Sequence, residues 1–185
     1  EHSRGFIGHP ALRGHRSGTA ATNRFVVKSA TQRDQTLTAL FVDVIAELEI
    51  SMTYTLTTSD VLLIDATVSN KGSSDYFLEH FLYWLPLAEA ADQSLDFYGH
   101  WTKERQPQRR DIQIGTWVRE SREGRSGHNF SIADIALTAQ TSFQSGSAWA
   151  TSIAWSGNSH YLVERGFDGQ QSIGAGELLL AGEVI

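Results

Sequence analysis

The stretch Leu48-Glu49-Ile50-Ser51-Met52-Thr53-Tyr54-Thr55-Leu56 decides the fold class. Its apolar residues alternate strictly with polar ones, a pattern that is typical of a β-strand with one buried face. The segment from Val61 to Ser69 repeats the alternation, and Asn70-Lys71-Gly72 supplies turn residues after it. Two half-buried strands separated by a short connection predict an antiparallel sheet.

Other segments extend this pattern. The nearly continuous apolar run Phe77–Leu87 predicts a central strand buried on both faces, although periodicity alone does not distinguish it from a helix. Alternation from Trp149 to Trp155, followed by the turn residues 156–159, predicts a hairpin with a strand over His160–Arg165. Asp168-Gly169 is a further hairpin signal. Because strands do not alternate with helical patterns, we expect an all-β antiparallel sandwich with at most short helices.

Composition limits the classes of partner. The chain has 185 residues, with 15 Lys and Arg against 21 Asp and Glu, and a formal net charge of −6. This balance disfavours a main role in binding nucleic acid or an anionic membrane, since both need a basic surface. No apolar stretch approaches the roughly 20 residues of a membrane-spanning helix. Cysteine is absent, which excludes disulfides and thiolate metal sites.

Two segments are less regular. The segment Glu1–Asn23 is rich in Gly, Arg and His, and we expect it to cross the surface as a long arm. The segment Asp92–Asn129 carries seven of the fifteen basic residues, interleaved with acids and tryptophans. A structureless segment of this length is uncommon in a compact domain, so it is either functional or contains strands of its own.

The first candidate site lies between Gly99 and Arg110. Its chemically useful residues are Trp101, Glu104, Arg105 and Arg109. An indole face packs on the C–H groups of a sugar, while guanidinium and carboxylate groups bind its hydroxyls. The structural alternative is a salt-bridged loop in an interface, with Glu104 paired to Arg105 or Arg109, and both interpretations remain open.

The second candidate site lies between Glu120 and Asn129 and contributes Glu120, Arg122 and His128. No GxSxG sequence surrounds Ser121, so a hydrogen-bonded turn is favoured over a hydrolase triad. The seven histidines form no HxH or HExxH motif, which gives a metal site little support, and His80 is predicted to be a core residue. No organic cofactor and no metal is predicted.

These segments, taken in order, resemble family 36 of the glycoside hydrolases, the bacterial and fungal α-galactosidases. Residues 99–109 and 120–128 resemble the family pattern G-x-W-x-[RK]-E-R … R … E-S-R-x-G-x-x-x-H. Trp155-Ser156-Gly157-Asn158 is similar to the family's [WY]-S-G-N sequence. Gly176–Glu183 is similar to G-E-x-L-x-P-G-E, with Ala181 where proline is usual. The match covers about Glu47–Ile185, and weakly Gly5–Phe25.

The resemblance implies the N-terminal β-supersandwich of such an enzyme. Family members also have a central (β/α)₈ barrel, which supplies the aspartate nucleophile and the aspartate acid/base, and a C-terminal β-domain. A barrel takes roughly 250 residues, so both catalytic carboxylates are expected beyond residue 185 and no catalytic residue is assigned in this chain. The resemblance implies retaining hydrolysis of terminal α-galactosides such as melibiose or raffinose by the parent enzyme.

The expected organisation is therefore one N-terminal β-sandwich domain over residues 1–185, as a fragment of a longer cytoplasmic enzyme. Its expected partners are its own downstream barrel, further copies in a homo-oligomer and α-galactoside sugars. Trp101, Glu104, Arg105, Arg109, Glu120, Arg122 and His128 are the candidate sugar or inter-domain contacts. The alternative hypothesis is a stand-alone carbohydrate-binding module that uses Trp101, Trp117 or Trp155. The apparent core positions of Trp149 and Trp155 argue mildly against that alternative.

Overall fold

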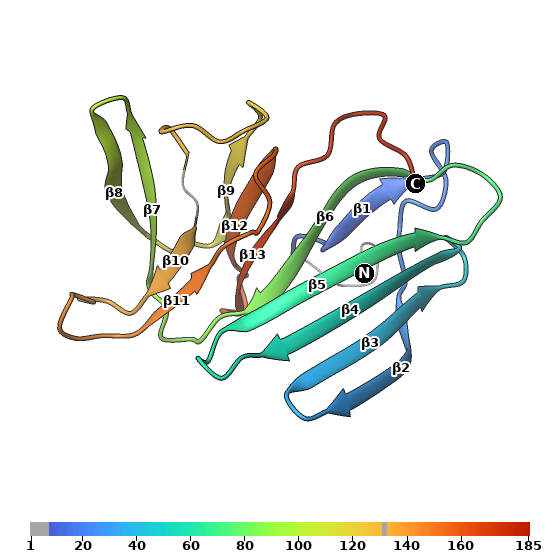
Figure 1. The fold of residues 1–185 in the computed structure, drawn as a ribbon, viewed down its shortest axis with the longest axis horizontal. Helices are drawn as coiled ribbons and strands as arrows, with labels where there is room; N and C mark the ends of the chain where they lie inside the picture. The colour runs from blue at the N-terminus through green and yellow to red at the C-terminus, as the bar shows by residue number, and fades with distance from the viewer. Residues whose placement is uncertain (1–7, 131–132) are drawn as a thin grey trace. The chain divides into compact units, whose positions relative to one another are not determined.

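A computed structural model describes residues 8–130 and 133–185, which form β-strands joined by turns and loops (Figure 1). The strands are β1 Leu12–His15, β2 Val26–Arg33, β3 Thr36–Asp43, β4 Leu48–Leu56, β5 Leu62–Asn70, β6 Phe77–Pro86, β7 Gln93–His100, β8 Lys103–Asp111, β9 Gly115–Ser121, β10 Asp134–Leu137, β11 Ala148–Thr151, β12 Ser159–Arg165 and β13 Gln171–Glu177. No helix in this part of the chain is long and apolar enough to cross a membrane. The predicted all-β antiparallel fold is confirmed.

The first of two compact units contains Leu12–Glu79 and Ala181–Ile185 and is built on the sheet β2-β3-β4-β5. The predicted alternating strand forms β4 with the predicted bounds, and β5 begins one residue later than predicted. Ile50 is buried, and it pairs with Phe41 of β3 and Val68 of β5. Apolar residues from three strands therefore share one face, as the period of two requires.

The second unit contains residues 8–11 and His80–Leu180 and is a sandwich of two antiparallel sheets. One sheet has the strand order β6-β13-β12-β9, and the other has the order β11-β10-β7-β8. Strand β6 begins in the first unit, where β1 pairs with it. Ala136 of β10 packs in one cluster with Val163 of β12 and Ile173 of β13. Because Ala136 comes from one sheet and the other two residues from its partner, this cluster fills the interior of the sandwich.

The predicted hairpin over Trp149–Arg165 is wrong. Strand β11 ends at Thr151 and pairs with β10, whereas β12 pairs with β13 and β9 in the other sheet. Trp155 is 49% exposed and is not a core residue. Turn residues mark where the chain changes direction, but they do not distinguish a hairpin turn from a loop that crosses to another sheet. The Asp168-Gly169 turn does join β12 to β13, and Gly169 takes a positive φ of 87° there.

Strand β6 confirms the strand assignment of Phe77–Leu87 but not its burial on both faces. Its side chains alternate instead, since Leu78 and Leu82 are buried whereas Glu79 is exposed. The prediction that His80 is a core residue is confirmed: the side chain is 4% exposed, and its Nε2 lies 3.1 Å from the carbonyl oxygen of Pro10.

The two irregular segments also contain strands. The segment Asp92–Asn129 forms β7, β8 and β9. Strand β8 gave no alternating signal because its residues from Lys103 to Pro107 are all exposed. The predicted surface arm is wrong for residues 8–23, since they include β1, whose Leu12 is 6% exposed, and the buried Asn23. Residues 1–7 of that arm lie outside the described part of the chain.

Candidate functional site

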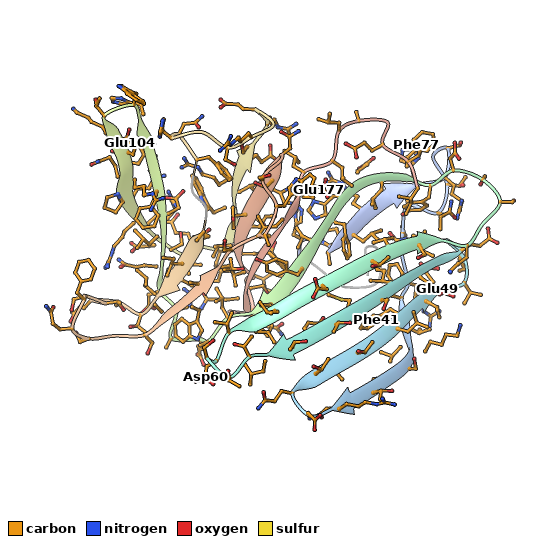
Figure 2. The ribbon with its side chains drawn as sticks, viewed as in Figure 1. Phe41, Glu49, Asp60, Phe77, Glu104 and Glu177 are labelled. Carbon is orange, nitrogen blue, oxygen red and sulfur yellow. The ribbon has the colours of Figure 1, made fainter. Side chains whose placement is uncertain are left out.

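Three of the predicted residues meet at the tip of the β7–β8 hairpin. Trp101, at the turn, is 75% exposed, and its ring lies edge-on to the His128 ring with 5.9 Å between centroids. His128 Nδ1 lies 3.9 Å from the Glu104 carboxylate, which Figure 2 shows at the end of the hairpin. An indole, an imidazole and a carboxylate therefore share one exposed surface, which we call the tip cluster.

The backbone of the hairpin fixes the position of Glu104. His100 pairs with Lys103, so Trp101 and Thr102 form a two-residue turn, in which Thr102 has a φ of 70°. The Thr102 amide donates a hydrogen bond of 2.9 Å to the Glu104 carboxylate. The pKa of Glu104 is lowered by this bond, by the amide of Glu104 itself, and further by His128 and His100. Glu104 therefore presents a negative charge that can attract a cationic or hydrogen-bond-donating partner.

The four other predicted residues do not join the tip cluster. Glu120 and Arg122 form their own exposed ion pair, with 2.7 Å between Glu120 Oε2 and Arg122 Nη2. Arg109 donates a hydrogen bond of 2.8 Å to the carbonyl oxygen of Thr141, toward the other end of β8. Arg105 is exposed. The predicted pairing of Glu104 with Arg105 or Arg109 is wrong, because Glu104 faces His128 and Arg109 is engaged by Thr141. The register of β7 and β8 shifts opposite Glu104 and Arg105, where Arg105 has a φ of 52°.

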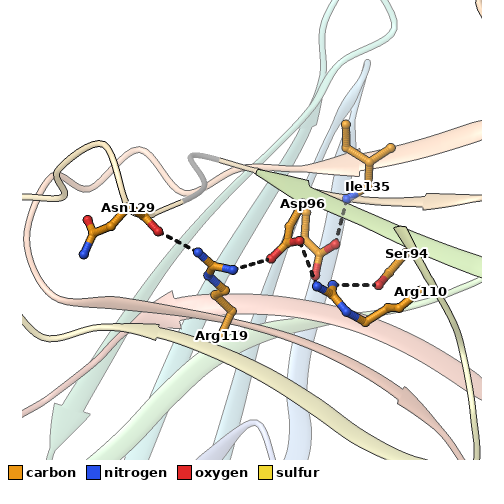
Figure 3. Close-up of polar contacts among 7 residues, drawn as sticks. Ser94, Asp96, Arg110, Arg119, Asn129 and Ile135 are labelled. Atoms are coloured by element: carbon orange, nitrogen blue, oxygen red, sulfur yellow. Dashed lines mark hydrogen bonds and ion pairs between the residues drawn. The ribbon is translucent and has the colours of Figure 1, made fainter. Parts of the chain in front are cut away.

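A buried ionic network lies in the same sandwich and was missed by sequence reasoning. The Asp96 carboxylate, 2% exposed, contacts Arg110 of β8 and Arg119 of β9 at 3.0 Å each (Figure 3). Arg110 also lies over the Trp117 ring, 4.0 Å from its centroid. Since β8 and β9 belong to different sheets, the Asp96 carboxylate connects the two layers of the sandwich.

Asp134 of β10 is a second buried carboxyl beside Asp96. Ile135 pairs with Leu95, so in an antiparallel register the next pair along is Asp134 opposite Asp96. One Asp134 oxygen accepts a hydrogen bond from the Ile135 amide, and the other has no hydrogen-bond partner among the described residues. Burial, followed by the negative charge of Asp96, raises the pKa of Asp134 to about 7. The sequence offered little signal, because the apolar neighbours Leu95 and Phe97 suggested the opposite face as the buried one.

Arg119 joins this network to the segment that carries His128. Its Nη1 donates to Asp96, while its Nη2 donates to the carbonyl oxygen of Asn129 at 2.6 Å. The same segment is held at a second point, where the Gly124 amide donates to Asn158 Oδ1 at 2.8 Å. Asp96 and Asp134 form a buried carboxyl pair, and Asp96 anchors one end of residues 121–130, the 121–130 segment, through Arg119.

The tip cluster and the buried network supply groups for recognition and for electrostatic anchoring. Within residues 8–130 and 133–185, no three His, Cys, Asp or Glu side chains are grouped so that they could hold a metal ion. The tip cluster offers one large aromatic face with a fixed carboxylate, a combination that suits contact with a polar surface or a sugar ring.

Comparison with known proteins identifies the domain. The family model described as "Glycosyl hydrolase family 36 N-terminal domain" matches residues 1–185. An α-galactosidase from Escherichia coli is 32% identical over 183 residues, which cover 99% of this chain and 26% of that protein. The chain therefore spans about a quarter of the length of this curated relative.

Solved structures share the fold. An α-galactosidase variant from Geobacillus stearothermophilus, in complex with stachyose, superposes with a TM-score of 0.84 at 21% identity, covering 97% of this chain and 29% of that one. The α-galactosidase from Lactobacillus brevis gives a TM-score of 0.84 at 22% identity, covering 94% of this chain and 26% of that one. The resemblance seen in the sequence motifs is confirmed. The chain belongs to the N-terminal domain family of the family 36 glycosyl hydrolases.

Proposed function

We propose that this chain is the non-catalytic N-terminal domain of a longer α-galactosidase and that it supports the catalytic barrel of that enzyme. The observation that carries the proposal is the family match over residues 1–185 together with the share of the E. coli α-galactosidase that the chain covers, 26%. In the proposed enzyme, the nucleophile and the acid/base aspartates belong to the barrel, and terminal α-galactosides of the raffinose type are hydrolysed with retention of configuration.

The tip cluster is the proposed contact with the rest of that enzyme. The Trp101 ring, which is 75% exposed, supplies the kind of aromatic side chain that is enriched at protein interfaces. Glu104 supplies a fixed negative charge beside Trp101, and the His128 ring packs edge-on against the Trp101 ring. The exposed Glu120–Arg122 pair, Arg105 and Arg109 are proposed to lie at the margin of the contact, where ion pairs contribute little energy. Assembly into a homo-oligomer is part of the same proposal.

A turnover assay tests the assignment of catalysis. The purified 185-residue chain is expected not to hydrolyse a nitrophenyl α-galactoside, whereas the longer polypeptide that contains it is expected to do so. Turnover by the isolated chain, or a longer polypeptide that is inactive on α-galactosides and active on another glycoside, would contradict the proposal.

A pair of variants tests the proposed contact. Trp101→Ala in the longer enzyme is expected to lower its thermal stability and its activity together. The matched control is Phe167→Ala, because Phe167 is a large apolar side chain of similar exposure, 76%, that lies between β12 and β13 and is not a member of the tip cluster. Equal effects of the two variants would remove the tip cluster from the contact while leaving the assignment of catalysis intact.

A further inference from the structure

The hydrogen bonds around the buried carboxyl pair satisfy Asp96 but leave one oxygen of Asp134 without a partner among the residues that the structure describes. Asp134 is 1% exposed, and its Oδ2 has no hydrogen-bond partner in the described part of the chain. A buried ionised carboxylate without partners is expensive, and two carboxylates directly opposite each other on neighbouring strands repel. A protonated Asp134 removes both costs, because its hydroxyl becomes a donor beside the Asp96 carboxylate.

The groups that face Asp134 come from four strands. They are Asp96 of β7, Arg110 of β8, Arg119 of β9 and Tyr161 of β12, while Thr151 is its pairing partner on β11. Both guanidinium groups are already engaged by Asp96 at 3.0 Å. An ionised Asp134 therefore competes with Asp96 for the same two arginines.

This competition reaches the surface through Arg119. The guanidinium that binds Asp96 also donates to the Asn129 carbonyl oxygen at 2.6 Å, and Asn129 follows His128 of the tip cluster. If Arg119 turns toward a second carboxylate, it gives up this bond. The hydrogen bond from Arg119 that holds the 121–130 segment is thereby linked to the charge of the buried Asp134.

We propose that the buried Asp134 carboxyl is protonated beside the Asp96 carboxylate, and that loss of this proton loosens the 121–130 segment by drawing Arg119 away from Asn129. The inference concerns the regulation of the tip cluster, but it does not depend on the proposed contact with a barrel, because every group involved lies within this chain. A negative α-galactosidase assay would therefore leave this inference intact, and failure of this inference would leave the proposed function intact.

Hydrogen–deuterium exchange of the chain between pH 6 and pH 8 tests the coupling. With a pKa of about 7, the ionised fraction of Asp134 rises about tenfold over this range, so the segment's exchange, corrected for intrinsic rates, should rise about tenfold. Asp134→Asn keeps the shape and the donor and should abolish this rise. Asp65→Asn, at an exposed position on β5, should behave as the parent. The same pH response in Asp134→Asn, or none in the parent, would overturn the proposal.

A second measurement needs no variant. Nuclear magnetic resonance of the parent chain, labelled with ¹³C at the aspartate carboxyl carbons, follows each aspartate through its titration. One buried aspartate is expected to titrate near pH 7, well above the usual aspartate value of about 4. Titration of every aspartate below about pH 5 would refute the proposal even if Asp134→Asn failed to fold.

Discussion

Replacing Asp96 by Asn tests whether the buried network holds the two layers of the sandwich together. The Asp96 carboxylate is 2% exposed, and the side chains of its partners Arg110 and Arg119 are 22% and 18% exposed. Asn is similar in shape but carries no charge, so both arginines lose their ion pairs with Asp96 in a largely desolvated setting. Ionisation of the neighbouring Asp134 would return part of this loss, so unfolding is compared at pH 5, two units below its pKa of about 7. Removing one partner of a buried ion pair costs about 3–5 kcal/mol, a large part of the roughly 5–15 kcal/mol that stabilises a domain.

Urea unfolding followed by tryptophan fluorescence measures this loss, and the midpoint should fall sharply. The matched control is Glu120→Gln, which breaks an ion pair of similar length, 2.7 Å, whose side chains are 35% and 61% exposed. Exposed pairs contribute about 1 kcal/mol or less, so this variant should unfold close to the parent.

A double variant separates charge from packing. In the Asp96→Asn background, Arg119→Met removes one of the two uncompensated charges while keeping apolar volume, so it should recover part of the lost stability. The reasoning is refuted if Asp96→Asn costs no more than Glu120→Gln. It is also refuted if Arg119→Met lowers stability further in the Asp96→Asn background.

Four other outcomes are expected. Folding holds the Asp134 proton more tightly, because its pKa is about 7 in the folded state against 3.8 in the unfolded chain. The resulting contribution to the free energy of unfolding, about 4 kcal/mol in all, is complete below about pH 4 and is lost as pH rises through 7. Calorimetry should therefore show Asp134→Asn gaining stability relative to the parent over that range. Leu162→Ala, at a side chain that is 1% exposed, should cost about 2–5 kcal/mol in denaturant unfolding, and a loss below about 1 kcal/mol would contradict its place in the core. Gly174→Ala should lower the melting temperature, since a Cβ there would collide with the Trp84 ring and with the backbone oxygen of Tyr83, and an unchanged melting temperature would contradict this close packing. Trp101→Ala should leave the stability of the isolated chain within about 0.5 kcal/mol, and a larger loss would show that the indole is structural.

Much of the fold could be read from local pattern. The alternation in β4 predicted its bounds and its buried face, because a strand with one face in the core must alternate with a period of two. The order of motifs from residue 99 to residue 183 indicated the family, which the match over residues 1–185 then confirmed. In the candidate site, the sequence indicated two separate polar segments, and the structure brings His128 of the second segment to Trp101 and Glu104 of the first.

Only the tertiary structure decided which strands pair and which polar residues are buried. The turn after Trp155 looked like a hairpin, but pairing depends on which sheet offers β12 a free edge, and β9 and β13 supply those edges. No pattern in the sequence indicated that Asp96 is buried, because its burial depends on two arginines brought from other strands, one of them in the opposite sheet. Sequence determines the propensity and face of a segment locally, whereas the balance between desolvation and pairing of a charge exists only once distant strands have come together.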